Sequence, residues 1–363
     1  MNRRAAALVA AAAAIVAAVL AIVLIGGDDD NARQPSGPAR AMALATAPSG
    51  DSYALIERTD EGMRGAAVGR VKNDGSIDAQ PIDLPIDDVT ALAIERDDAL
   101  LVAGTRRVDG KRRLAIGRLD LDGRPDRSFG TDGVLTVKAG DGDAIPRGIA
   151  ASTGGSSAAV VADATRDTRH AMALVRVDLG TGRTRVDLAD EATAAGVVPG
   201  PKAGFTVAGT DTRNGYLVTG FMNATGAPGT SRSRTSLRNA TWRAIAPIPG
   251  GGAVVVGSGR TPDLRSLIAF ARLTPTGGEA DQGTVAVGEG DAYGQAVQAN
   301  RDGQIQIAAN GTQDDAPAAY LVTFPGGRDP ARKAMGRAVG VTPEGGMLVT
   351  RWDGQRQSVA FNP

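Results

Sequence analysis

Pairs of acidic residues recur in the polar segments of this chain, between stretches of apolar sequence. The members are Asp87, Asp88, Asp141, Asp143, Asp190, Glu191, Glu289 and Asp291. Carboxylate oxygens that converge are the preferred ligands of hard divalent cations. One interpretation is therefore a site for a divalent cation or a cationic ligand, and the other is that these are solvated loop charges. No other cofactor is predicted.

Basic residues form a second recurring group. The strongest candidates for a binding site are Arg106, Arg107, Arg112, Arg113, Arg166, Arg169 and His170, with Lys111, Arg213, Arg260 and Arg265 in similar positions. Clustered positive charge attracts an anionic partner such as an envelope polymer, a lipid headgroup or an acidic protein. The alternative interpretation is that these are solubilising charges in hairpin loops.

Catalytic residue types are scarce. The chain has no Cys and a single His, His170, which excludes thiol enzymes, Cys-ligated metal centres and any mechanism that needs two imidazoles. No G-x-S-x-G, Walker-type or H-E-x-x-H motif is present. We therefore predict no catalytic residue, although two carboxylates alone could act as acid and base on a glycan.

The overall composition narrows the class of protein further. The 363 residues carry 40 basic and 40 acidic side chains, so the chain is not a strongly basic nucleic-acid-binding protein. Hydrophobic residues make up 42% of the chain, which is enough for a packed core. The 49 glycines indicate many tight turns.

The elements that must position these charges form a repeat. A polar or Gly turn followed by a short apolar strand recurs seven times, at a mean spacing of about 49 residues. The copies begin at Ser49, Arg96, Thr153, Lys202, Gly250, Arg301 and Glu344. Four short strands in a period of about 40 to 50 residues are typical of a β-propeller blade. The sequence thus predicts an all-β, seven-bladed β-propeller over residues 39–363.

A second alignment, on the third strand of each unit, supports the same period. It places Arg70, Arg118, Arg176 and Arg272 at one equivalent position. The last unit ends at Pro363 without an evident fourth strand. Either that blade has three strands, or a segment near the N-terminus completes it.

The predicted blade places the two groups of charges on one face of the ring. In a four-stranded blade, the loops that join strand 2 to strand 3 emerge on the same face as the loops that join one blade to the next. The basic residues belong to the first kind of loop and the acidic residues to the second. We therefore expect an acidic inner rim surrounded by basic outer loops.

One unit also resembles a known family. The segment Leu114–Val137 is similar to the delta-60 repeat of bacterial exported proteins, through Arg118, Asp122, Gly123, Asp126, Phe129, Gly130 and Gly133. The first unit repeats part of this pattern, and later units lose its phenylalanine–glycine part. The resemblance implies a propeller-like fold and carries no established activity. We expect the Asp-Gly pair to form a turn and Phe129 to pack between blades.

The N-terminus predicts a membrane location. Residues 5–25 are an apolar run behind Arg3 and Arg4, and 21 helical residues span about 31 Å, the thickness of a bilayer core. The arginines predict a cytoplasmic N-terminus and an extracytoplasmic ring. Residues 1–26 are thus a single transmembrane anchor, and residues 27–38 are a flexible linker. A cleaved signal peptide, which would release a secreted protein, is the alternative.

These expectations combine into two functions. The first is a membrane-anchored propeller that serves as a protein- or ligand-binding platform at the cell envelope, its partners being the membrane itself and an envelope protein or anionic polymer. The second is a carbohydrate-active envelope enzyme that uses paired carboxylates where the acidic loops meet.

Overall fold

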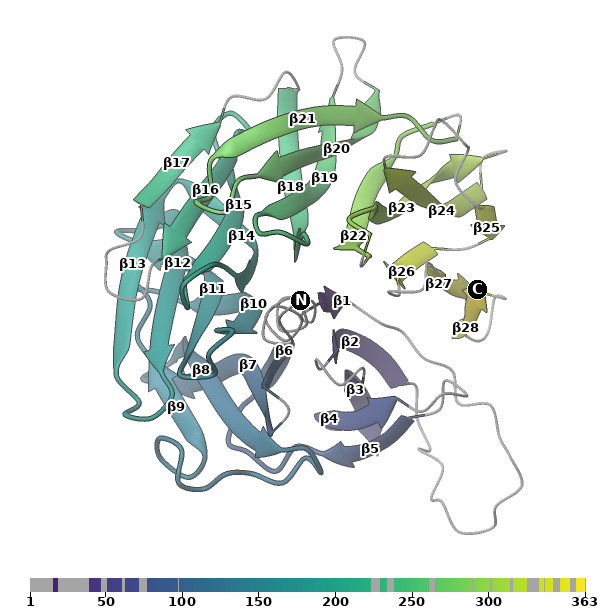
Figure 1. Cartoon of the computed structure of the whole chain (residues 1–363). Helices are drawn as coiled ribbons and strands as arrows, with labels where there is room; N and C mark the ends of the chain where they lie inside the picture. The colour runs from purple at the N-terminus through teal and green to yellow at the C-terminus, as the bar shows by residue number, and fades with distance from the viewer. Residues whose placement is uncertain are drawn as a thin grey trace, which may run out of the picture.

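A computed structural model of the chain describes sixteen stretches of residues: 16–18, 39–46, 51–60, 63–71, 77–96, 98–222, 229–233, 238–260, 265–288, 290–300, 302–313, 316–324, 333–335, 337–341, 347–352 and 357–362. All regular elements in these stretches are β-strands, and they form separate antiparallel sheets arranged as a ring (Figure 1). The prediction of an all-β propeller is confirmed.

The strands follow one another in chain order within each sheet. The first sheet holds β1 (Val16–Ala18), β2 (Ala39–Thr46), β3 (Ser52–Asp60), β4 (Met63–Val71) and β5 (Ile77–Pro81). The second holds β6 (Asp88–Glu95), β7 (Ala99–Val108), β8 (Lys111–Asp120) and β9 (Val134–Val137). The third holds β10 (Ala144–Ala151), β11 (Ser157–Arg166), β12 (Arg169–Asp178) and β13 (Thr184–Asp190).

The remaining sheets repeat this order. The fourth holds β14 (Ala192–Pro199), β15 (Phe205–Asp211), β16 (Leu217–Met222) and β17 (Gly229–Ser233). The fifth holds β18 (Arg238–Pro247), β19 (Ala253–Arg260), β20 (Ser266–Leu273) and β21 (Glu279–Val285). The sixth holds β22 (Tyr293–Ala299), β23 (Ile305–Gln313), β24 (Ala316–Phe324) and β25 (Lys333–Met335), and the last holds β26 (Arg337–Val341), β27 (Met347–Trp352) and β28 (Gln357–Asn362).

The number of complete blades differs from the prediction. Six sheets have four or more strands, whereas the sheet β26–β28 has three, so the described residues form six full blades and not seven. Among the described residues the C-terminal unit has three strands, and the described N-terminal strand β1 pairs with β2 of the first sheet.

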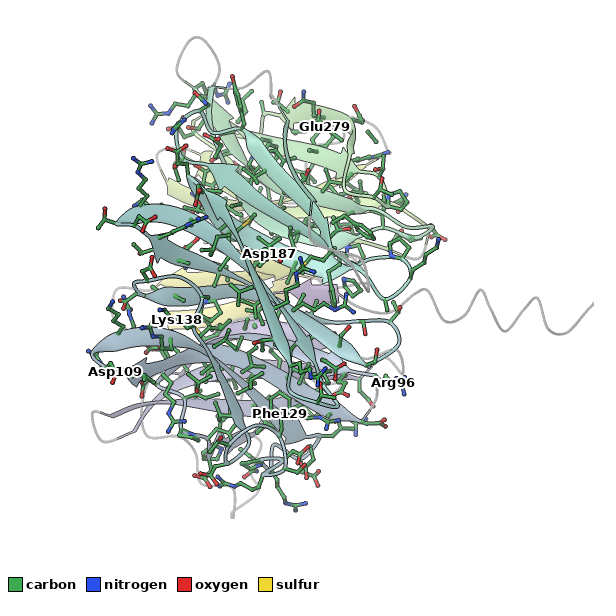
Figure 2. All side chains as sticks on the ribbon, turned by 90° about the vertical axis from the view of Figure 1, so that its left-hand side faces the viewer. Arg96, Asp109, Phe129, Lys138, Asp187 and Glu279 are labelled. Carbon is green, nitrogen blue, oxygen red and sulfur yellow. The ribbon has the colours of Figure 1, made fainter. Side chains whose placement is uncertain are left out.

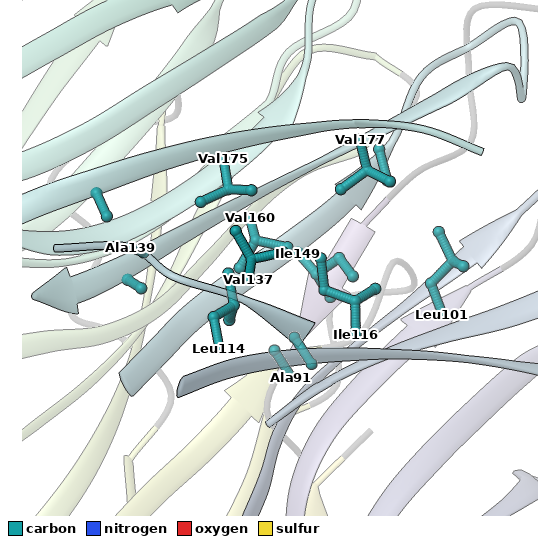
Figure 3. Close-up of a cluster of buried hydrophobic side chains, with 14 of the residues drawn as sticks. Ala91, Leu101, Leu114, Ile116, Val137, Ala139, Ile149, Val160, Val175 and Val177 are labelled. Carbon is teal, nitrogen blue, oxygen red and sulfur yellow. The ribbon is translucent and has the colours of Figure 1, made fainter. Parts of the chain in front are cut away.

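The core lies between the blades. Strands 2 and 3 of a blade are covered on both sides, so β7 is buried at each position from Ala99 to Thr105 and its sequence is continuously apolar. One such cluster joins the second and third sheets and includes Leu101, Ile116 and Val160 (Figure 3). Each buried aliphatic side chain of this size contributes about 1.5–3 kcal/mol. Phe129 belongs to the same cluster, which confirms its predicted place between blades.

Each innermost strand carries a β-bulge at one equivalent place. The pairing register of the strand shifts by one residue in all seven sheets, at Met42, Thr90, Arg147, Ala195, Arg243, Gln295 and Val339. The bulge brings the inner strand close to the second strand. A Cβ on Gly257 would lie 2.0 Å from the carbonyl oxygen of Thr241. The same kind of contact explains the glycines of the V-A-G-T and V-V-G-S segments, which are Gly104, Gly209 and Gly257.

The predicted N-terminal helix falls almost entirely outside the described residues. Of residues 5–25, the structure describes Val16–Ala18, which form β1 and pair with Leu44–Thr46 of β2. No helix with the length and apolarity needed to cross a bilayer occurs in the described part of the chain. The transmembrane anchor and the linker over residues 27–38 therefore stay predictions.

Candidate functional site: the hairpin face

The charged loops lie on one face of the ring, as expected. The β7–β8 hairpin ends at Asp109, and the turn after β6 begins at Arg96; these two residues lie at opposite sides of the molecule (Figure 2). Lys138, which begins the connection from β9 to the next blade, lies on the same side as Asp109. We call this side, formed by the strand 2–3 hairpins and the blade-to-blade loops, the hairpin face.

The β7–β8 hairpin is the most basic of these loops. Its turn residues Asp109 and Gly110 both have positive φ angles, 50° and 74°, as a two-residue type I′ turn requires. The turn fixes the register, so Arg106 lies opposite Arg113 and Arg107 lies opposite Arg112. Four guanidinium groups are thereby held within two rungs of one ladder.

Three basic residues of this hairpin are engaged with the blade-to-blade loop over residues 138–143. Arg112 Nε lies 2.9 Å from Asp143 Oδ2, and Lys111 Nζ donates to the carbonyl oxygen of Asp141 at 2.6 Å. Arg113 donates to the carbonyl oxygens of Gly140 and Gly142. By contrast, the guanidinium groups of Arg106 and Arg107 make no hydrogen bond or ion pair within the described part of the chain.

In the next hairpin, β11–β12, some basic residues are again paired and others are not. Arg166 and Arg169 face each other across the ladder, and His170 lies opposite Thr165. Arg166 Nη1 lies 3.5 Å from Asp190 Oδ1. Arg169 and His170 are exposed, and their side chains have no partner among the residues that the structure describes.

Later blades add fewer free charges. Arg213 forms an ion pair with Glu191, and Arg265 donates to the carbonyl oxygens of Gly288 and Gly290. Arg260, at the end of β19, is exposed, and its side chain has no partner in the described stretches. The basic side chains of the hairpin face that lack an ion pair within the described residues therefore lie mainly on the β7–β8 and β11–β12 hairpins.

The acidic residues of the blade-to-blade loops accept hydrogen bonds from the hairpins. Asp87 Oδ2 accepts the backbone N–H of Arg107 at 2.8 Å, and Asp143 Oδ1 accepts that of Arg112 at 2.8 Å. Asp291 Oδ1 accepts the N–H of Ser266 at 2.7 Å. Asp88 and Asp141 accept longer bonds, from Thr105 and from Asp167.

These contacts bear on the predicted metal site. Within the described residues, no three acidic or histidine side chains come together in a group able to hold a metal ion. Asp190 and Glu191 are each paired with an arginine, Arg166 and Arg213. Glu289 lies outside the described residues. The seven predicted carboxylates that the structure describes are thus engaged in hydrogen bonds or ion pairs with the hairpins.

On the hairpin face, the pKa shift of Asp143 is opposite to the rise that an acid catalyst requires. Hydrogen bonds from the backbone and side chain of Arg112 lower the pKa of Asp143, so this carboxylate stays charged. Burial raises the pKa of Glu95, opposed by Arg118, whose Nε lies 2.8 Å from Glu95 Oε2. Glu95 ends β6 next to Arg96, on the side opposite the hairpin face.

A polar position that the sequence reasoning missed joins neighbouring blades at Asp163 and Thr210. The second strand of each blade carries a polar residue at one register position. This position lies opposite the residue that stands two places before the bulge of the first strand. The residues are Glu57, Thr105, Asp163, Thr210, Ser258, Asn310 and Thr350. Asp163 Oδ1 accepts the N–H of Ala194, and Thr210 Oγ1 accepts that of Trp242, both at 2.8 Å. The signal in the sequence is a single polar residue that ends each apolar run.

Comparison with known proteins supports the propeller fold and does not identify a function. No protein-family model and no curated protein matches this sequence, so the delta-60 resemblance stays a prediction. Hydrazine synthase from Kuenenia stuttgartiensis is similar in structure, with a TM-score of 0.59 and 13% identity over 94% of this chain and 99% of that chain. A protein from Lactobacillus plantarum gives a TM-score of 0.55 and 16% identity over 83% and 89% of the two chains.

A third similar structure is described as a propeller in its own right. It is the β-propeller domain of the Trilobed protease from Pyrococcus furiosus, with an open velcro topology, a TM-score of 0.53 and 10% identity over 86% of this chain and 89% of that chain. Enzymes thus occur among the proteins that share this fold. At identities this low the likeness shows the fold alone, and the described residues contain no catalytic motif.

Proposed function

We propose that this chain is a binding protein of the cell envelope, anchored by its N-terminal apolar segment, whose hairpin face recognises an anionic partner. The observation that carries the proposal is the division of the basic residues into two sets. Lys111, Arg112 and Arg113 hold neighbouring loops, whereas Arg106, Arg107 and Arg169 make no ion pair within the described residues. Arginines held in a fixed register but not neutralised suit recognition of carboxylate, sulfate or phosphate groups.

The charge balance of the chain sharpens this proposal. With 40 basic and 40 acidic side chains, the molecule as a whole has no attraction for a polyanion. Binding to a polyanion therefore requires a local excess of positive charge. The β7–β8 hairpin carries such an excess in its own sequence, because residues 106–113 hold five basic side chains and one acidic side chain.

Retention on an immobilised polyanion tests the proposal. We expect the full chain, in a nonionic detergent, to bind a heparin column at low salt and to elute as the salt concentration rises. The variant Arg106→Gln/Arg107→Gln/Arg169→Gln should elute at clearly lower salt. A matched variant, Arg96→Gln/Arg124→Gln/Arg183→Gln, removes the same charge from turns on the side opposite the hairpin face and should elute like the wild type. Equal loss in both variants would reject the proposal.

We also infer that the sheet β26–β28 is the seventh, incomplete blade of the ring. Two features support this inference. Its first strand has the register shift between Ala338 and Gly340, and Thr350 occupies the polar position of its second strand. Both features are shared with the six full blades, so the three-stranded sheet repeats the blade pattern up to the end of its third strand.

A further inference from the structure

Among the side chains that the structure describes, the inner wall of the ring, formed by the first strand of each blade, exposes two arginines. β10 and β18 are innermost strands of their sheets (Figure 1). Arg147 and Arg243 are the bulge residues of these strands, and both are exposed although they lie in the middle of their strands. A bulge frees a residue from the ladder and re-aims its side chain. Solvent therefore reaches the inner wall at both arginines.

The two arginines differ in one neighbour. Arg147 Nε lies 2.7 Å from Asp163 Oδ2, so its charge is neutralised within the blade. The residue at the same register position in the blade of Arg243 is Ser258, which carries no charge. Arg243 forms no ion pair with any residue that the structure describes. The third blade thus contains a built-in counter-ion that the fifth blade lacks.

Arg243 is nevertheless held in place. Its guanidinium carbon lies 4.9 Å from the ring centroid of Tyr293, which belongs to β22 of the next blade. A cation over an aromatic face is stabilised without losing its charge or its hydrogen-bond donors. Gln295, the bulge residue of β22, and the exposed Thr241 add uncharged polar groups to the same two strands.

We propose that Arg243, with Tyr293 and Gln295, forms a binding site on the inner wall for a ligand that carries a carboxylate or phosphate group. The planar guanidinium matches the paired oxygens of such groups. The amide of Gln295 supplies a further donor and acceptor. This site is separate from the hairpin face and does not depend on the function proposed for it.

Side-chain NMR of the full chain labelled with ¹⁵N-arginine tests this site, with inorganic phosphate and acetate as probes. We expect the Nε–H signal of Arg243, assigned by its loss in Arg243→Gln, to shift and saturate on titration. The signal of Arg147, assigned in the same way, serves as the internal control and should stay in place. Tyr293→Leu should weaken the response of Arg243 severalfold.

A single substitution offers a sharper control because it leaves Arg243 intact. Ser258→Asp copies the arrangement of the third blade and should neutralise Arg243, which would abolish its response to both probes. The proposal is overturned if Arg243 does not respond in the wild type, if it still responds in Ser258→Asp, or if exposed arginines such as Arg183 respond to the same degree.

Discussion

At Gly257 the lack of a side chain lets the bulged inner strand approach the second strand. A Cβ there would lie 2.0 Å from the Thr241 carbonyl oxygen, which is closer than any real contact. We therefore expect Gly257→Ala to lower the free energy of unfolding by about 1–3 kcal/mol. Gly65→Ala is the control, because nothing lies within 4 Å of a Cβ at Gly65. Urea unfolding of both variants measures the difference; equal stabilities would contradict the close approach.

Asp143 makes stability depend on pH. Its pKa is lowered from the ordinary value of 3.8 by its bonds to Arg112. A carboxylate with a lowered folded pKa stabilises the protein above its unfolded pKa and loses this effect as pH falls through the folded pKa. We expect Asp143→Asn to be less stable than the wild type at pH 7, by no more than about 1 kcal/mol because the pair is partly exposed.

The pH dependence of this difference provides its check. Thermal unfolding of Asp143→Asn and wild type should converge as the pH falls through the lowered folded-state pKa of Asp143, below which this carboxyl group is protonated in both states. A stability difference that is unchanged between pH 7 and strongly acidic pH would assign the effect to packing and not to charge.

Residue types alone located the charged face but not the roles of its members. The sequence placed Arg106, Arg107, Arg112 and Arg113 in one loop, and the type I′ turn of Asp109 and Gly110 confirms that loop. It could not separate Arg112, bound to Asp143, from Arg106. That difference depends on contacts between segments about 30 residues apart in the chain, which no local pattern encodes.

Among the elements, the second strands of the third and fourth blades bind the next blade through their polar end residues, Asp163 and Thr210. Thr210 accepts the buried N–H of Trp242 in the next blade. We expect Thr210→Val to cost about 1–3 kcal/mol, because the variant leaves that N–H without a partner. Thr210→Ser keeps the hydroxyl and should cost clearly less.

Hydrogen exchange at the Trp242 amide distinguishes the loss of this hydrogen bond from a simple packing effect. In Thr210→Val the Trp242 amide should exchange faster than amides in distant blades, whereas in Thr210→Ser it should remain protected. Uniformly faster exchange through the whole ring in Thr210→Val would contradict a local effect of the Thr210–Trp242 hydrogen bond.

The strands themselves were predictable, and their irregularities were not. Apolar runs bounded by turns correctly predicted the second and third strands of every unit, because these strands are buried on both sides by neighbouring blades. The bulges leave no such signal, since Arg147, Ala195 and Arg243 occupy equivalent places with unrelated side chains. The inner-wall arginines were missed for that reason.

For the molecule as a whole, the absence of cysteine makes topology directly measurable. A single Arg183→Cys in the full chain would place one thiol on an exposed turn of the ring. In intact cells that produce the chain, we expect a membrane-impermeant maleimide to label it, because the ring is proposed to be extracytoplasmic. If the anchor is retained with its N-terminus in the cytoplasm, Asn2→Cys should be labelled only after the cells are lysed.

The same experiment separates the two N-terminal interpretations. Cleavage of a signal peptide would remove the Cys at position 2 and shorten the mature chain, whereas a retained anchor keeps both. Protection of Arg183→Cys in intact cells would contradict an extracytoplasmic ring.

Recognition of an anionic partner by the hairpin face is best tested by the salt dependence of binding to fluorescent heparin. Fluorescence anisotropy gives Kd of the full chain at a series of salt concentrations. We predict that Arg106→Gln/Arg107→Gln/Arg169→Gln binds about tenfold more weakly at low salt and with a shallower salt dependence, because fewer charge contacts are made. A wild-type affinity that does not change with salt, or an identical dependence in the variant, would contradict the account.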